Sequence, residues 1–392
     1  MENREFEEKT TDETENPEVG SDRSVESPKE KRFILPQVHL TKRDGVTLRE
    51  AIVVRTLAIL AALIVCAIMT VVVTHDNPFS IYATIFKGAF GTGRGFDTLH
   101  DIALLLCVSL AVTPAFRMHF WNIGAEGQTL IGGLATAIVM FFFHDKVPIG
   151  LLAVMMLAAG LFAGAVWGVI PAIFKAQWNT NETLFTLMMN YVAIQLVEFF
   201  LKVGDKSGSN TVGPRLLGDG LPNLFGVQYL FNIVVVAFLT IILYIYLRYS
   251  KQGYEISVVG ESENTARYIG INVKKVVIRT MILSGALCGL AGFLIVGGAS
   301  HSIKGDTVGG RGFTAIMVSW LAKFNPLMMV LTTLLLVFMA RGADEVSTVF
   351  ELNKSFSDII TGIILFFIIG CEFFIRYRVH FDRSNVQEKE GN

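Results

Sequence analysis

The segment FWNIGAEGQTLIGG, residues 120–133, decides how this chain folds. It lies between two apolar segments, yet it carries Asn122, Glu126 and Gln128 among four glycines. A carboxylate beside a hydrophobic span is costly unless it has a partner or a function. Glycine permits bends and close contacts between backbones. We therefore interpret this segment as the broken start of a membrane helix, whose polar groups face protein or a water-lined cavity.

The composition excludes an ordinary soluble enzyme. Hydrophobic residues make up 52% of the chain, charged residues 17%, and the mean hydropathy is +0.52. Soluble domains are about 25% charged. The four cysteines each lie in an apolar segment without CxxC pairing, so we expect neither a disulfide framework nor a metal site. The chain is predicted to be a membrane protein with several spans.

Apolar segments of the required length recur along the chain, since a helix needs about 20 residues to cross a bilayer. The candidate spans are 51–73, 102–118, 124–143, 148–173, 183–201, 226–247, 276–298, 312–323, 326–341 and 357–376. Segment 312–323 is too short for a full span, and 102–118 is short and contains Pro114. Either can be re-entrant or broken. The predicted fold is an all-α polytopic membrane protein with about ten transmembrane segments.

Basic residues orient these spans, because loops rich in Lys and Arg stay in the cytoplasm. The basic residues before the first span place the N-terminus inside, and counting spans then places loop 248–275 and the C-terminus inside. Loops 74–100 and 202–225 are expected outside. Both termini are therefore predicted to be cytoplasmic, and eight spans with both short pieces re-entrant would preserve this arrangement.

The ends of the chain differ in composition from its middle. The first thirty residues contain eleven acidic and four basic residues with almost no apolar content, which is typical of disorder. We expect a disordered acidic cytoplasmic tail over 1–48, a transmembrane domain over 49–378 and a cytoplasmic tail over 379–392.

Glycines also recur at helical spacing inside the spans. Two faces, Gly160/Gly164/Gly168 and Gly285/Gly289/Gly292, carry small residues that let membrane helices pack closely. A second polar, glycine-rich interruption, GDTVGGRG, occupies 305–312. Breaks at corresponding positions of two halves are typical of transporters whose solute site lies between the halves.

No catalytic constellation accompanies these breaks. No glycine is followed directly by lysine, so the chain has no P-loop, and HExxH and GxSxG are absent. We expect no catalytic site. A transporter of this kind takes energy from an ion gradient or from a separate subunit. A gradient requires titrating acids within the spans, and the candidates are few: Glu126, Glu182 and Glu198. Glu182 also has capping-box spacing with Asn179.

A separate energy-supplying subunit requires a docking element on the cytoplasmic side. Residues 253–275, GYEISVVGESENTARYIGINVKK, contain signals for a short helix over 263–269. Ser262 can cap its start and Gly270 can end it. A short helix can dock in a groove of a partner. The alternative is an ordinary solvated loop.

Several motifs together resemble a known family. In order along the chain they are FWNIGAEGQTLIGG (120–133), NETLFTLMMNY (181–191), VVGESENTARYIGINVKKV (258–276) and LSGALCGLAGFL (283–294). They resemble the permease subunits of bacterial ABC importers of the ribose/nucleoside branch. The nucleoside-type permeases are the nearest match because NIGAEGQ is typical of them. The chain departs from the family pattern, nearer GENPEAARYAGI, at residues 262–265, and its acidic tail lies outside that pattern.

This resemblance implies a function and partners. The family's cytoplasmic loop before the seventh span docks on the ATPase, and the coupling positions that match here are Gly260, Glu261, Ala266, Arg267, Tyr268 and Gly270. The expected partners are a second, different permease chain, a cytoplasmic ATPase that hydrolyses ATP, an extracellular or periplasmic substrate-binding (lipo)protein, and membrane lipid. We expect this chain to bind no cofactor and no nucleic acid, and to reside in the bacterial cell membrane.

The resulting hypothesis is a non-enzymatic permease subunit of an ATP-driven nucleoside importer. The expected pathway residues are Asn122, Glu126, Gln128, Phe185 and Asn190. Amides and a carboxylate suit ribose hydroxyls and base edges, and Phe185 can stack on a base or simply pack in the core. Glu126 can instead bind backbone amides at a broken helix start. The alternatives are a permease for ribose or another simple sugar, and an ion-coupled secondary transporter.

Overall fold

The structure is a computed structural model that describes residues 37–42, 47–75, 77–91, 93–144, 146–204, 215–216, 221 and 229–382. The chain forms two units, residues 1–42 with 378–392, and residues 43–377. In the first, strand β1 (Gln37–Lys42) pairs with β4 (Tyr377–Asp382). Both strands fall largely within the predicted tails. The acidic residues before 37 and the end of the chain from 383 lie outside the described residues.

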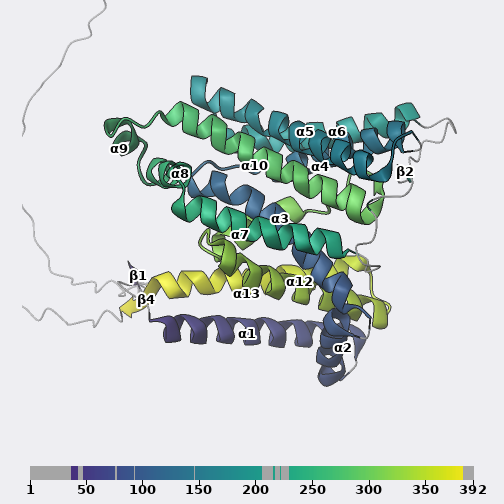
Figure 1. The fold of residues 1–392 in the computed structure, drawn as a ribbon. Helices are drawn as coiled ribbons and strands as arrows, with labels where there is room; N and C mark the ends of the chain where they lie inside the picture. The colour runs from purple at the N-terminus through teal and green to yellow at the C-terminus, as the bar shows by residue number, and fades with distance from the viewer. Residues whose placement is uncertain are drawn as a thin grey trace, which may run out of the picture. The chain divides into compact units, whose positions relative to one another are not determined.

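Helices make up nearly all of the second unit, as Figure 1 shows. In the described residues they are α1 (Leu48–Thr74), α2 (Pro78–Phe90), α3 (Gly95–Arg117), α4 (Ala125–Phe143), α5 (Ile149–Trp178), α6 (Glu182–Gly204), α7 (Leu230–Tyr249), α8 (Lys251–Glu261), α9 (Glu263–Tyr268), α10 (Val273–Ile295), the π-helix η1 (Val296–Ser300), α11 (Arg311–Leu321), α12 (Pro326–Val349) and α13 (Lys354–Arg376). Two-residue strands β2 (Arg215–Leu216) and β3 (Ser302–Ile303) pair antiparallel.

The all-α polytopic prediction is confirmed. Among the described residues, nine helices are long and apolar enough to cross a bilayer. The tenth predicted segment, 312–323, is the 11-residue helix α11, which is as short as expected. Segment 326–341 proves longer, since α12 continues to Val349.

Two boundary predictions were wrong. The expected outer loop 74–100 contains α2 and the first turns of α3, and the expected short span 102–118 is a 23-residue helix that begins at Gly95. Asn77 caps α2 by accepting a hydrogen bond from Phe79 N–H (3.0 Å), a local signal that a 20-residue hydropathy window does not register. The first turns of α3 carry Asp97 and Asp101, which conceal the helix from the same window.

The ends of the chain's first and last long helices meet. Arg55 of α1 forms an ion pair with Glu372 of α13, so the two helices run antiparallel. Thr113 near the end of α3 contacts Met329 near the start of α12, and α8 packs on the end of α3. The start of α1, the end of α13 and the α8–α9 segment therefore lie at one end of the helical unit (Figure 1). The ten-segment prediction requires this arrangement, because it places both termini and loop 248–275 on the same side of the membrane.

The glycine faces bring α5, α10 and α4 into close backbone contact. Gly164 of α5 faces Gly285 and Gly289 of α10, and a Cβ atom on Gly164 would lie 2.7 Å from Gly289 Cα. Gly132 of α4 meets the same Gly289. The predicted packing faces are confirmed, because only a hydrogen side chain permits this approach.

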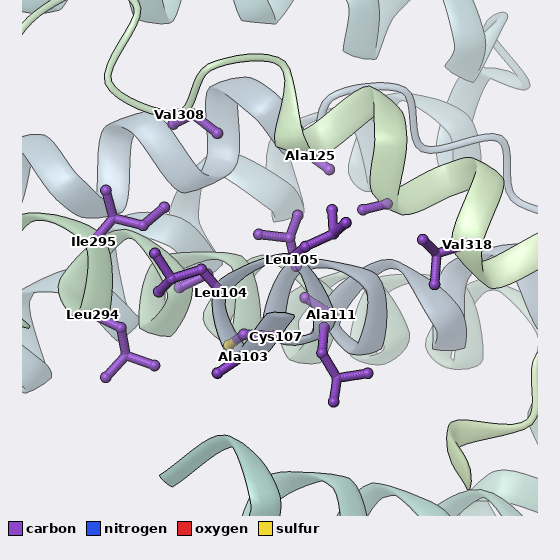
Figure 2. Close-up of a cluster of buried hydrophobic side chains, with 14 of the residues drawn as sticks. Ala103, Leu104, Leu105, Cys107, Ala111, Ala125, Leu294, Ile295, Val308 and Val318 are labelled. Atoms are coloured by element: carbon purple, nitrogen blue, oxygen red, sulfur yellow. The ribbon is translucent and has the colours of Figure 1, made fainter. Parts of the chain in front are cut away.

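Helix α3 is the centre of the helical unit. Its residues from 102 to 116 are all buried, and apolar side chains surround it, as a helix without an exposed face requires. Figure 2 shows this core, where side chains of α3 meet those of neighbouring helices and of the turn before α11. The labelled residues are Ala103, Leu104, Leu105, Cys107, Ala111, Ala125, Leu294, Ile295, Val308 and Val318.

Candidate functional site

The break between α3 and α4 is closed by two side-chain amides. The backbone turns at His119, which has a left-handed φ of 59°. Asn122 is fully buried, and its Oδ1 accepts hydrogen bonds from Gly124 N–H (3.1 Å) and from Gln128 Nε2 (3.0 Å). Its Nδ2 donates to Gln128 Oε1 (3.2 Å). This reciprocal pair satisfies both buried amides and fixes the chain's entry into α4.

A third amide comes from α6. Asn190 Oδ1 accepts from Gly127 N–H (2.9 Å), and its Nδ2 donates to the Ile123 carbonyl (3.0 Å). The N–H groups in the first turn of a helix have no partner within that helix. Asn190 therefore supplies a cap to α4 from a different helix. A side chain at Gly127 would block this cap, because its Cβ would lie 2.8 Å from Asn190 Oδ1.

Glu126 joins the two glycine-rich breaks. Its Oε1 accepts from Gly310 N–H (2.8 Å) and its Oε2 from Gly312 N–H (2.7 Å), at the start of α11. Gly309 and Gly310 have φ of +65° and +75°, where side chains are strained. A carboxylate at a helix N-terminus is stabilised by its partial positive charge. Backbone amides at a broken helix, the alternative partners expected for Glu126, are thus its partners in the structure.

The predicted aromatic residue, Phe185, and the neighbouring Trp121 make no side-chain bond in this network. Phe185 packs against Phe174, with ring centroids 4.9 Å apart, near the end of α5. Trp121 is 45% exposed and faces Trp320 at 5.4 Å. The structure therefore brings together four of the five predicted pathway residues, the three amides and the carboxylate.

Glu126→Gln is expected to destabilise the protein by about 1–3 kcal/mol, the usual cost of losing a charge-assisted hydrogen bond. Glutamine can accept one N–H of α11 but presents its NH2 group to the other. Glu198→Gln is the control, since within the described residues Glu198 accepts one bond, a longer one from Gly305 N–H (3.2 Å). Apparent melting temperature in detergent is the measurement. Equal shifts for both variants would contradict this role for Glu126.

The other candidate acids are also engaged within the protein. Glu182 forms an ion pair with Lys175 (2.9 Å). The expected capping box of Asn179 and Glu182 was wrong, because Asn179 ends α5 with φ of 51° and Asn181 caps α6 by accepting from Leu184 N–H. Both Asn179 and Asn181 of the NTNE sequence can cap a helix start. Which of them caps α6 depends on where α5 ends.

The α8–α9 segment lies between α7 and α10. Ser262 Oγ accepts from Thr265 N–H (3.2 Å) at the start of α9, and Gly270 ends the segment with φ of +85°. The helix predicted over 263–269 is confirmed within one residue. Helix α8 was missed, because its mixed polar sequence has no apolar run.

The six predicted coupling residues divide into two groups of three. Gly260, Ala266 and Gly270 shape the segment, since Gly260 packs on the carbonyl of Arg117 at the end of α3 and Ala266 is fully buried. The other three, Glu261, Arg267 and Tyr268, are exposed. Tyr268 is 94% exposed, the largest value among the exposed apolar and aromatic residues that the structure describes. An aromatic side chain in this setting offers a contact surface to a partner.

A group of charged residues in the helices escaped the sequence analysis. Asp101 of α3 accepts from Arg341 Nε of α12 (2.6 Å) and pairs with Arg311 of α11 (3.5 Å). Arg311 and Arg341 lie 210 and 240 residues after Asp101 in the sequence. The signal that could have found them is the charge of Asp101 and Arg341 beside otherwise apolar runs.

The fold and its paired breaks define a polytopic membrane protein of the transport class. A family model described as the permease component of the branched-chain amino acid transport system matches residues 96–369. The chain therefore belongs to this permease family. It is a multi-pass plasma membrane protein and a transport subunit of the ABC permease type, as the motifs indicated.

Relatives of known name support this membership. The chain is 29% identical over 346 residues to a glucose ABC transporter permease protein of Haloferax volcanii, covering 83% of this chain and 90% of that protein. It is 29% identical over 319 residues to the guanosine ABC transporter permease protein NupP of Bacillus subtilis, covering 79% and 90%. A second guanosine permease protein of that bacterium, NupQ, is 25% identical over 241 residues, covering 59% and 75%.

Proposed function

We propose that this chain is a permease subunit of an ATP-driven importer that carries nucleosides into the cytoplasm. The observation that carries the ATP-driven part is α9, a capped helix that presents Tyr268 and Arg267 at the end of the unit where α7 joins α10. The chain has no P-loop, so the ATPase is a separate subunit. A segment held rigidly on α3 by Gly260 can transmit a movement of the ATPase to the spans.

The nucleoside part rests on the motif NIGAEGQ and on the guanosine permease relatives. Guanosine permease proteins NupP and NupQ of one bacterium both resemble this chain, which favours a partner permease of different sequence. A binding protein outside the membrane completes the proposed complex. The glucose permease relative of Haloferax volcanii favours a sugar as the second candidate solute.

The four polar residues of the break take a positioning role in this proposal. Asn122, Gln128 and Asn190 hold the start of α4, and Glu126 ties it to α11. Because Glu126 joins the starts of α4 and α11, these two helix ends either move together or both stay in place when the protein changes between outward-open and inward-open states. The bonds of all four are directed at protein groups, so they support a role in shaping the pathway.

Reconstitution tests this function directly. Proteoliposomes that contain the chain, its second permease, the ATPase and the binding protein are expected to take up labelled guanosine when ATP reaches the ATPase. Uptake should persist after proton and sodium gradients are collapsed, and unlabelled D-glucose should not compete. Gradient-driven uptake by this chain alone, indifferent to ATP, would overturn the ATP-driven assignment. ATP-driven uptake of glucose but not guanosine would overturn only the nucleoside assignment.

A further inference from the structure

A cluster of charged residues on α3, α11 and α12 lies outside both the 120–133 break and the α8–α9 segment. Asp101 lies between the guanidinium groups of Arg311 and Arg341. The side chains are neither buried nor free, with 24% of Asp101, 31% of Arg311 and 33% of Arg341 exposed. A shared carboxylate that remains partly accessible can exchange one of its partners for a ligand.

These charged side chains lie too far inside their helices to be surrounded by lipid. Asp101 is the seventh residue of α3, about 9 Å from its start, and Arg341 lies eight residues before the end of α12, about 12 Å from it. Ionised side chains at such positions face the protein interior or water, because contact with hydrocarbon is too costly. The exposed parts of these three side chains therefore face a polar space.

That space is a cavity of ≈ 420 Å³ between α3, α11, α12 and α13. Two further carboxylates, Asp344 and Asp358, line the cavity, and the Ser357 hydroxyl of α13 donates to Asp344 (2.6 Å). Thr314 of α11 and Thr361 of α13 contribute hydroxyl groups to its wall. The volume is within the range of small-molecule sites, about 300–1,000 Å³. The wall offers both hydrogen-bond donors and acceptors, with arginines and aspartates of opposing charge. Such a wall suits a neutral solute with several hydroxyl groups.

The cavity also adjoins the residue that ties the two breaks together. Arg311 is the first residue of α11, and Glu126 accepts the N–H groups of the residues on either side of it, Gly310 and Gly312. A solute that draws Arg311 away from Asp101 therefore acts on the same helix turn that Glu126 holds. This contact gives solute binding a direct route to the start of α4.

We propose that this cavity binds the transported solute through its hydroxyl groups, with Asp101, Arg311 and Arg341 as the polar ligands. This inference rests on the proposed function and assigns its solute site within one permease chain. A furanose hydroxyl donates to the Asp101 carboxylate and accepts from an arginine, and the hydroxyl-bearing wall of α13 completes the contact.

Site-directed thiol labelling tests the assignment in the assembled complex in lipid nanodiscs. The four native cysteines, all buried, are first replaced by alanine or serine. Thr361→Cys and Thr314→Cys then place a thiol on opposite walls of the cavity. Val349→Cys, 54% exposed at the end of α12 and outside the cavity, is the matched control. A water-soluble methanethiosulfonate reagent is added with and without guanosine, D-ribose or D-glucose.

Both cavity thiols are expected to react, and the solute that the complex transports should slow them at least fivefold. The Val349→Cys rate should not respond to solute. Unreactive cavity thiols, or rates unchanged by a solute that the same complex transports, would overturn the cavity site and leave the proposed function standing. Transport and protection by D-glucose or D-ribose but not guanosine would overturn the nucleoside assignment and leave the cavity site standing.

Discussion

Replacing Gly289 of α10 by leucine is expected to abolish the folded permease. A Cβ atom at this position would overlap the carbonyl of Gly160 and lie 3.3 Å from Gly164 Cα, both on α5. Overpacking against side chains costs about 1–3 kcal/mol. Here the obstacle is backbone of a neighbouring helix, so the cost should reach or exceed the upper value. That is a large part of the about 5–15 kcal/mol by which folded proteins are stable.

The measurement is the folded fraction and apparent melting temperature after detergent extraction, followed by gel filtration. Gly362→Leu on α13 is the matched control, since a Cβ there meets nothing within 4 Å. The control should elute and melt like the parent, or slightly above it because leucine is the better helix former. If Gly289→Leu behaves as Gly362→Leu does, the close packing of α10 on α5 is not what holds these helices together.

Tyr268→Ala is expected to release the ATPase while leaving the permease folded. An exposed aromatic anchor at an interface typically contributes 2 kcal/mol or more, which corresponds to about 30-fold weaker binding. The side chain is 94% exposed, so its removal should not change the stability of this chain. Arg267→Ala should add a smaller effect, because its ion pair with Glu263 lies on the surface.

Co-purification with the ATPase, followed by ATP-dependent guanosine uptake, measures this effect. Tyr191→Ala is the matched control, because Tyr191 is a 60% exposed tyrosine inside the span α6 and out of reach of a cytoplasmic subunit. Its variant should retain the ATPase. If the Tyr268→Ala, Arg267→Ala double variant still binds the ATPase as the parent does, α9 is not part of the docking surface.

Elements fixed by interactions local in sequence were predicted well, whereas those that depend on distant partners were not. Helix α9 was predicted within one residue because Ser262 caps it three residues before Thr265, a contact local in sequence. Helix α3 was predicted too short, since the expected span 102–118 began just after Asp101 and left out the first turns of the helix. Arg341, the partner of Asp101, lies 240 residues away, so nothing near Asp101 indicates that its charge is compensated within the helices.

At the 120–133 break, the local sequence predicted the broken helix but not the partners of Glu126. Its glycines and polar residues predicted a broken helix, and the structure has one between α3 and α4. Its chemistry was left between solute binding and backbone capping. The capping contacts come from Gly310 and Gly312, 184 and 186 residues further along, whose N–H groups both bond to Glu126.

The sequence by itself determined the membrane class, the positions of most spans, the two breaks, the short helix α9 and the kinship with ABC permeases. Hydropathy, capping and glycine spacing act over a few turns of one helix, so they can be read along the chain. Tertiary structure alone decided that Glu126 caps α11, that Asp101 lies between Arg311 and Arg341, and that a polar cavity opens beside them. A buried polar group is stable only with its partner, and these partners meet only when the helices pack.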